Sequence, residues 1–193
     1  MSSLSTAPRR RGSAEGRSDR VDALVAATIA ELRSYGYDGL SVRNAARRAG
    51  VAPATAYTYF ASKDHLVAEV FWRRLQTLGP VGVDGRQRPR TRVANALRAL
   101  AQLIAEEPEL AAASTTAILS ADPDVQRLRV RIGSTVSSFL ADALGADGDP
   151  AVLRALNLAL SGALLQAGMG YFTYPELAER MDEVVGLVVG SRR

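Results

Sequence analysis

Apolar residues recur at three- and four-residue intervals through most of this sequence, and we find no stretch in which apolar and polar residues alternate. Spacing of three and four residues puts apolar side chains on one face of an α-helix, whereas a half-buried strand needs alternation. Val21, Leu24, Val25, Ile29 and Leu32 give the first such stripe. The chain shows no internal repeat. It is therefore predicted to have an all-α fold.

Start and stop signals divide the first third of the chain into short helices. Ser41 is a good N-cap, and Gly50 supplies the left-handed residue that ends a helix. Pro53 can open the next helix, where a missing N–H costs nothing, and we expect that helix to cover about residues 53–60. Two short helices joined by a glycine-containing turn make a helix-turn-helix. A further helix start follows at Ser62.

Composition divides the chain into four predicted segments. Residues 1–18 contain arginines and no apolar stripe, so we expect a disordered basic arm. Residues 19–78 form the helix-turn-helix domain. Residues 79–90 break the helical pattern with glycine and proline and are predicted to be a linker or mobile loop. Residues 91–193 form a second helical domain.

The positive charge lies in the first third of the chain. The formal net charge is +4, but residues 39–63 alone carry Arg43, Arg47, Arg48 and Lys63 with no acidic residue. Such a distribution is expected if this third of the chain meets a polyanion and the rest does not. The helix-turn-helix is therefore predicted to bind nucleic acid.

Composition argues against several other classes of protein. With no cysteine and one histidine, His65, the chain has little from which to build a metal site. Acidic residues cluster near 106–109 and 122–124, but they flank prolines at predicted helix starts, where they stabilise the helix dipole. With no glycine-rich phosphate loop either, we expect neither an enzyme nor a cofactor.

One segment is long enough to cross a membrane, because no charged residue lies between Arg154 and Glu176. Polar residues and glycines interrupt it, so a helix in a core or a subunit interface is the preferred interpretation. The basic N-terminus is followed by no apolar run of the kind that a secretory signal has. The lack of cysteine fits a reducing compartment, and we expect a cytoplasmic protein without membrane contact.

The predicted second helix of the helix-turn-helix carries residues suited to DNA. That helix enters the major groove in such motifs. Pro53 and Ala54 allow close approach of the backbone to base edges, and Thr55 can donate a hydrogen bond or contact a thymine methyl group. The hydroxyls of Tyr57 and Tyr59 point to different sides, so both can reach phosphates or one can turn inward.

Two basic residues flank this helix. Arg43 stands in the first turn of its helix, where the dipole disfavours a cation, so a phosphate partner becomes plausible. Lys63 adds a positive charge at a helix start that already favours an anion. Arg47 and Arg48 fit either a DNA contact or a solvated helix face, and Phe60 is assigned to the core.

Two stretches, LSVRNAARRAGV at residues 40–51 and ATAYTYFASKDHL at residues 54–66, resemble the DNA-binding domain of the TetR family of bacterial repressors. The similarity covers residues from about 20 to 72. It includes a Ser-Val-Arg opening, an Ala-Gly-Val turn, an aromatic pair and a lysine after serine. The phosphate or base contacts that the resemblance implies are Ser41, Arg43, Pro53, Ala54, Thr55, Tyr57, Tyr59 and Lys63.

Three residues depart from the family pattern. Ala45 and Ala56 stand where larger aliphatic residues are common, which suggests a thinner core under the recognition helix. Thr58 stands where a basic residue or histidine is frequent. A charged contact is therefore in doubt at that position, and we expect a shifted base preference there.

The resemblance also implies a homodimer built from the last two long helices, roughly 151–172 and 175–190, that reads a pseudo-palindromic operator in double-stranded DNA. The sequence agrees, because the segment from Val152 to Phe172 is apolar on nearly all sides and contains small residues that allow close helix packing.

The family's C-terminal domain generally encloses an effector pocket, so the resemblance implies a ligand-responsive regulator, repression being the family default. The predicted pocket residues are Leu100, Ile104, Leu119, Leu128, Ile132, Phe139, Leu160, Leu164, Met169 and Phe172. A core would use the same residue types. A small, mainly apolar effector is expected, and lipid-like acids, acyl thioesters, steroids and drugs all fit. The main alternative is a helical ligand-binding or interaction protein that has lost DNA binding.

Overall fold

The computed structural model describes residues 11–79, 86–146 and 148–189. All regular structure in these residues is helical, so the predicted all-α fold is confirmed. The elements are α1 (Arg11–Gly39), α2 (Val42–Arg48), α3 (Pro53–Tyr57), α4 (Lys63–Leu75), α5 (Pro89–Ala105), α6 (Pro108–Ala117), α7 (Pro123–Leu144), α8 (Pro150–Gly168), the 3₁₀ helix η1 (Tyr174–Glu176) and α9 (Leu177–Val188).

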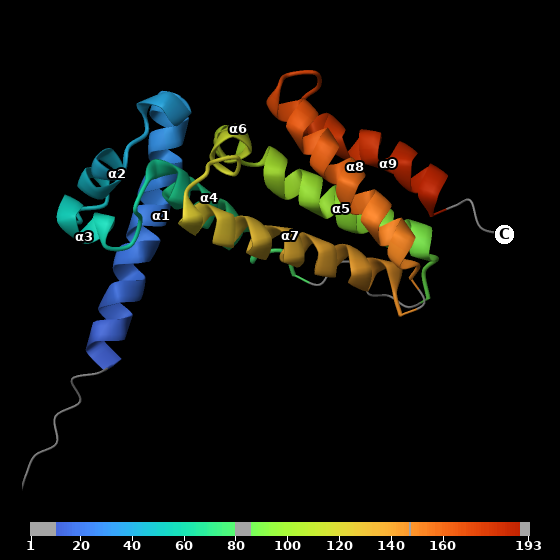
Figure 1. Ribbon diagram of the computed structural model, residues 1–193, viewed down its shortest axis with the longest axis horizontal. Coiled ribbons are helices and arrows are strands. Elements are labelled where there is room, and N and C mark those ends of the chain that lie inside the picture. The colour runs from blue at the N-terminus through green and yellow to red at the C-terminus, as the bar shows by residue number, and fades with distance from the viewer. Residues whose placement is uncertain (1–10, 80–85, 147, 190–193) are drawn as a thin grey trace, which may run out of the picture.

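Helices α1 to α4 gather at one end of the molecule around a core of their own (Figure 1). Leu24, Leu32, Phe60, Leu66 and Val67 are all 3% exposed or less. The predicted caps are confirmed. The Ser41 and Ser62 hydroxyls accept hydrogen bonds from the backbone N–H groups three residues later, at 3.1 Å, and Gly50 has a φ of +67°.

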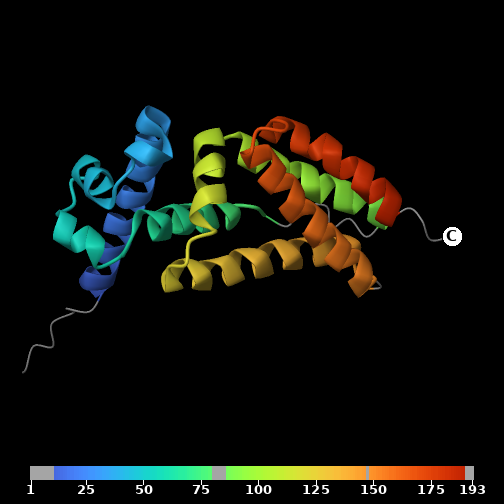
Figure 2. The same ribbon diagram turned by 45° about the horizontal axis from the view of Figure 1, so that its top comes forward.

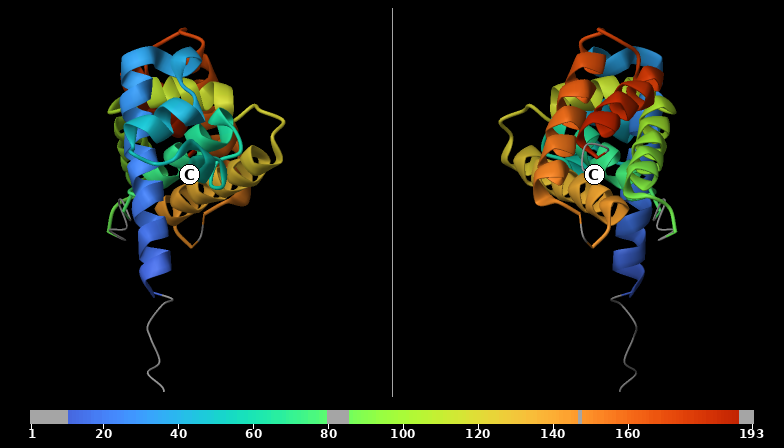
Figure 3. Two further views of the ribbon diagram at one scale, coloured as in Figure 1. Left: turned by 90° about the vertical axis from the view of Figure 1, so that its left-hand side faces the viewer. Right: turned by 90° about the vertical axis from the view of Figure 1, so that its right-hand side faces the viewer.

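Helix α1 begins at Arg11, so residues 11–18 of the predicted disordered arm are helical instead. Residues 1–10 of that arm lie outside the described residues. Figure 3 shows this end of α1 projecting past the packed helices. A projecting helix has no core to face and needs no apolar stripe, and it was the missing stripe that predicted disorder.

Helix α3 is also shorter than predicted, since it ends at Tyr57 and not near residue 60. The backbone N–H groups of Tyr59 and Phe60 both donate to the carbonyl of Ala56, at 3.0 and 2.9 Å. The chain turns here because Phe60 must reach the core, where it is 3% exposed. The recognition helix is therefore a five-residue element followed by a tight turn.

The other helices form the rest of the molecule, where α5 packs against α7 and α9, and α8 against α9 (Figure 2). Their shared core includes Leu97, Leu100, Leu140, Leu156 and Met181. In the predicted linker, residues 80–85 lie outside the described residues, and α5 begins at Pro89, just inside its predicted end.

Helix α8 has an apolar face that the other described residues leave uncovered. Leu158, Leu165 and Met169 are 75%, 44% and 57% exposed. In the described part of the chain it is the one helix that is long and apolar enough to span a bilayer, a test that rests on length and composition alone. The helix therefore presents an apolar strip to solvent.

Candidate nucleic-acid interface and internal cavity

Helix α3 presents a small, mainly uncharged surface to solvent. Pro53 and Ala54 are exposed, Thr55 is half-buried and Tyr57 is 52% exposed. Ala56 points the other way and is fully buried in the core of the first four helices. Burial of this one residue fixes which side of α3 faces outward, and that side carries four of the predicted DNA contacts. The hydroxyl of exposed Thr58 donates back to the Thr55 carbonyl, at 2.6 Å.

Some polar residues of α2 and its cap are bonded within the protein, and others are free to contact DNA. The Ser41 hydroxyl caps α2, so it already accepts one hydrogen bond. The Arg48 guanidinium pairs with the Glu31 carboxylate at 2.5 Å. Because Glu31 is almost fully buried, this pair neutralises a buried charge and stabilises the fold. Arg43 and Arg47 are exposed and form no ion pair with any described residue. These two arginines are the cations that α2 leaves available for an anion.

The side chains of Lys63 and Tyr59 both contact other residues of the protein. The Lys63 ammonium donates to the Tyr37 carbonyl at 3.2 Å and lies 4.0 Å from the centre of the Tyr37 ring. An ammonium has three N–H donors, so this bond leaves others for a phosphate. The Tyr59 ring packs edge-on against Phe60 and lies 5.4 Å from the Arg17 guanidinium. Arg17 belongs to the segment predicted to be disordered, so sequence patterns missed this contact.

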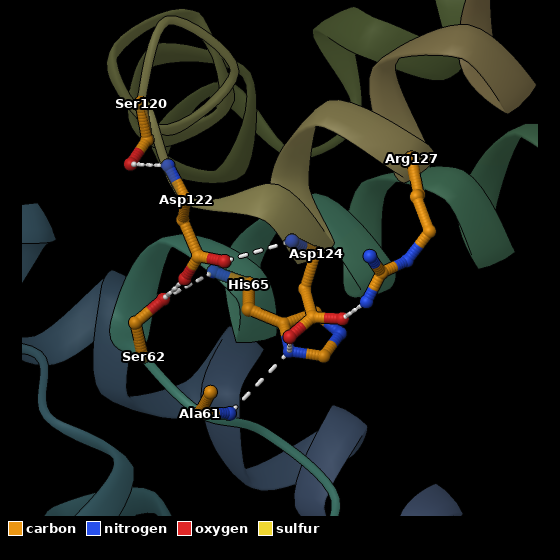
Figure 4. A network of polar contacts seen from close by, with 7 residues as sticks. All are labelled: Ala61, Ser62, His65, Ser120, Asp122, Asp124 and Arg127. Carbon is orange, nitrogen blue, oxygen red and sulfur yellow. Dashed lines mark hydrogen bonds and ion pairs between the residues drawn. The ribbon is translucent and has the colours of Figure 1, made fainter.

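A polar network joins the N-termini of α4 and α7 (Figure 4). The Ser62 hydroxyl donates to the Asp122 carboxylate at 2.6 Å, and this bond lowers the pKa of Asp122 below its ordinary value. His65 accepts a hydrogen bond from the Ala61 N–H at 3.4 Å and lies 3.9 Å from the Asp124 carboxylate. The end of the stretch that holds the predicted DNA contacts is thus bonded directly to the second half of the molecule.

A cavity of about 470 Å³ lies among α4, α5, α6, α7, α8 and η1. This volume falls within the range of pockets that hold drug-sized ligands. Six of the ten predicted pocket residues line it, and these are Leu100, Ile104, Leu119, Ile132, Leu160 and Leu164. Five of these six lie on α5, α7 and α8, and Leu119 follows the end of α6.

The other four predicted pocket residues lie elsewhere. Leu128 packs in a separate cluster with Val125 and Ala68, because α7 turns that side toward α4. Phe139 packs against the core of the second half. Met169 follows the end of α8 and is 57% exposed, while Phe172 lies partly buried under Arg180. Leu128 and Phe139 are separated from the cavity by the orientation of α7, and Met169 and Phe172 by their place beyond the end of α8.

Sequence patterns also missed several residues that do line the cavity. Phe71 and Leu75 come from α4, which the sequence assigned wholly to the first domain. Their four-residue spacing in an apolar stripe was the available signal. The polar lining residues were missed because the prediction selected apolar types, and they are Ser114, Thr115, Arg129, Asn157, Ser161 and Tyr174.

Helix α6 takes part in both halves of the molecule, between which it lies in Figures 1 and 2. Leu110, Ala113 and Ala117 belong to the core that α1 to α4 share. Ser114 and Ile118, on another side of the helix, line the cavity. Helix α6 therefore connects the wall of the cavity to the core of the first four helices.

Comparison with known proteins agrees with this arrangement. The chain is 46% identical over 170 residues to a protein of Mycobacterium tuberculosis named as an HTH-type transcriptional regulator, an alignment that covers 87% of this chain and 79% of that protein. The family model described as bacterial regulatory proteins of the tetR family matches residues 24–70. The chain belongs to the TetR family. This TetR-family protein is accordingly a DNA-binding transcriptional regulator with a helix-turn-helix, as its sequence predicts.

More distant relatives of this TetR-family chain cover nearly its whole length. The transcriptional repressor KstR of Rhodococcus jostii is 27% identical over 190 residues, covering 94% of this chain and 89% of the repressor. A TetR transcriptional regulator from Rhodococcus sp. RHA1 has the same fold, with a TM-score of 0.74, 22% identity and coverage of 93% and 99%. The regulator FadR of Bacillus subtilis, solved in complex with stearoyl-CoA, has a TM-score of 0.62, 16% identity and coverage of 89% and 99%.

Proposed function

We propose that this TetR-family protein is a ligand-responsive repressor. It binds a pseudo-palindromic operator as a homodimer, and a small, mainly apolar effector in the 470 Å³ cavity releases it. The observation that carries the proposal is the double role of α6, which contributes Ser114 and Ile118 to the cavity wall and Leu110 and Ala113 to the core of the DNA-binding domain. A ligand that favours one position of α6 changes the population of DNA-binding conformations.

The DNA contacts that we propose are those of the outward side of α3 and its neighbours. Pro53, Ala54, Thr55 and Tyr57 face the groove, where small side chains let the backbone approach base edges. The phosphates are bound from the flanks of this surface by the remaining predicted residues, Ser41, Arg43, Tyr59 and Lys63. Arg43 is exposed and unpaired in the described chain, so it is the cation best suited to a phosphate.

The homodimer that we propose uses residues 151–190. Leu158, Leu165 and Met169 leave an apolar face along α8, and Leu187 of α9 is 72% exposed. Exposed apolar patches mark interaction sites, and a subunit interface is the one that we propose here. A two-fold dimer presents two copies of α3, which matches a pseudo-palindromic operator. This explanation also removes any need to place α8 in a membrane.

Two observations support an effector in the cavity. The lining residues are mostly apolar, with a few polar groups that can orient a ligand, as is usual for small-molecule sites. FadR, which shares the fold, was solved with stearoyl-CoA bound. We therefore propose this mainly apolar cavity as the site of the effector.

Selection of bound duplexes from a random library tests the DNA half of the proposal. We expect enrichment of a two-fold symmetric sequence and an affinity that falls steeply as salt rises, because phosphate contacts release counterions. Fluorescence anisotropy across a salt series measures this. Absence of binding to every duplex would support the alternative, a helical ligand-binding protein without DNA-binding activity.

A further inference from the structure

The mouth of the cavity carries one cation. Among the described residues that line the cavity, Arg129 of α7 is the one with a charged side chain. It is exposed, as are its neighbours in the lining Gly133 and Ser161, so the guanidinium lies where the cavity opens to solvent. No carboxylate in the described part of the chain pairs with it. A positive charge at the edge of an apolar space attracts an anionic group.

Carbonyl groups hold the Arg129 guanidinium in place. Its Nε donates to the Ile118 carbonyl at 2.7 Å and its Nη2 to the Ser120 carbonyl at 2.8 Å, just past the end of α6. Its Nη1 makes no hydrogen bond to any described residue. A guanidinium fixed in this way loses little side-chain entropy when it binds a carboxylate, a group whose geometry it matches.

We propose that the cavity binds an apolar monocarboxylic acid, with the carboxylate on Arg129 and the apolar body among Leu100, Ile132 and Leu160. This proposal rests on the proposed function and names the chemical class of its effector. A neutral apolar molecule would make no charge-assisted hydrogen bond to Arg129. A coenzyme A thioester carries several phosphate charges, whereas the described lining offers the single charge of Arg129.

The same arginine links the carboxylate site to the DNA-facing segment. Arg129 is bonded to the carbonyls of Ile118 and Ser120, and Asp122, two residues further on, is bonded to Ser62. A carboxylate bound at the free Nη1 shares the guanidinium with these two carbonyls, so binding at the cavity mouth acts on the loop between α6 and α7. The head group of the ligand therefore acts on the contact that joins α7 to the start of α4.

Isothermal titration calorimetry on the full-length protein tests the ligand class. The probes are decanoic acid, decan-1-ol and decanoyl-CoA. We expect the acid to bind about tenfold more tightly than the alcohol, as a charge-assisted hydrogen bond predicts, and more tightly than the thioester. In Arg129→Gln the acid should fall to the affinity of the alcohol, whereas Arg129→Lys should keep part of the preference. Arg131→Gln, which removes a neighbouring charge outside the lining, should leave it unchanged.

Equal binding of acid and alcohol by the wild-type protein, tighter binding of the thioester, or no binding of any probe would each overturn the proposal. Retention of the full preference by Arg129→Gln would do the same. The acid–alcohol contrast needs no variant, so it stands even if Arg129→Gln folds poorly. Operator affinity is measured with and without the acid, and an affinity that the bound acid leaves unchanged would count against the proposed function while the ligand class stayed readable.

Discussion

The DNA-facing surface and the cavity differ in how many parts of the chain they require. The predicted DNA contacts come from the single stretch 41–63, in which α3 presents Pro53, Ala54 and Tyr57 outward. The cavity takes its walls from six helical elements. A substitution on the DNA-facing surface alters one exposed side chain. A substitution in the cavity wall also alters packing between helices. Specificity for DNA can therefore vary more freely than the shape of the cavity.

The α6 helix limits how far the two regions can be treated as separate. Its residues Leu110 and Ala117 pack under the DNA-facing surface, while Ala111 and Thr115 line the cavity. The network from Ser62 to Asp122 adds a second connection. Variants that affect one region and spare the other show how far the two regions are coupled.

The largest expected effect comes from Phe60, which supports the DNA-facing surface from below and is 3% exposed. Phe60→Ala should lower the free energy of unfolding by about 3–5 kcal/mol, because it leaves a cavity in the core. Urea denaturation measures this. Tyr57→Ala, at a neighbouring residue that is 52% exposed, should change the value by less than about 0.5 kcal/mol. Similar losses in both variants would contradict the assignment of inner and outer sides.

The proposed dimer interface gives the next effect. Leu158→Glu places a charge on the uncovered face of α8, where Leu158 is 75% exposed. We expect the dimer dissociation constant to rise at least about thirtyfold, the loss of roughly 2 kcal/mol typical of a central interface residue. Sedimentation velocity measures the oligomeric state. Val130→Glu, at an equally exposed valine of α7 that is 72% exposed, should leave the dimer intact, and a dimer that survives both changes excludes this face.

Tyr57 tests the DNA-facing surface itself. Tyr57→Ala should weaken operator binding about tenfold, the effect of losing one hydrogen bond to a charged phosphate, with fold and dimer unchanged. Lys63→Ala should also weaken binding, although its bond to the Tyr37 carbonyl makes a small structural change possible. Gel-shift titration measures both. The control is Tyr35→Ala, at a tyrosine that is 64% exposed and lies outside the predicted contacts. Wild-type affinity in Tyr57→Ala would remove that residue from the interface.

The hydrogen bond between Ser62 and Asp122, which joins the two regions, should make the free energy of unfolding depend on pH. The pKa of Asp122 is lowered in the folded protein, chiefly by the Ser62 hydroxyl, so its ionised form is stabilising. That contribution is present at neutral pH, above the ordinary value of 3.8, and is lost as the pH falls through the lowered pKa.

Asp122→Asn should therefore differ from the wild type more at neutral pH than in acid, by no more than about 1 kcal/mol for a partly exposed group. Urea denaturation at each pH measures the difference. A double-mutant cycle with Ser62→Ala should show coupling between the two residues. Strictly additive effects would mean that each residue acts only on its own helix start, where the Ser62 hydroxyl accepts from the His65 N–H and the Asp122 carboxylate from the Asp124 N–H.

The smallest effect is expected inside the cavity wall. The hydroxyl of Ser114, which is 5% exposed, has no hydrogen-bond partner in the described chain. Ser114→Ala should therefore change the free energy of unfolding by less than about 0.5 kcal/mol, or raise it. The Thr115 hydroxyl lines the same cavity but donates to the Ala111 carbonyl at 3.1 Å, so Thr115→Val should cost about 1 kcal/mol. A larger loss in Ser114→Ala would reveal an unseen partner.

The sequence by itself determined the all-α fold, the caps at Ser41 and Ser62, the turn at Gly50 and the family. These features depend on groups within about four residues of each other, as in the hydrogen bond from the Asn44 N–H to the Ser41 hydroxyl. Such local hydrogen bonds form wherever the residue types stand at the right spacing. They can be predicted without knowing what packs against the helix.

Only the tertiary structure decided which apolar residues enclose the cavity. Leu128 and Ile132 are one turn apart on α7, yet Ile132 lines the cavity and Leu128 packs against α4. The placement of Arg17 over Tyr59 and of Arg129 at the cavity mouth was equally hidden. Each of these depends on the angle at which distant helices cross, and that angle follows from packing over the whole core, which no single stretch of sequence specifies.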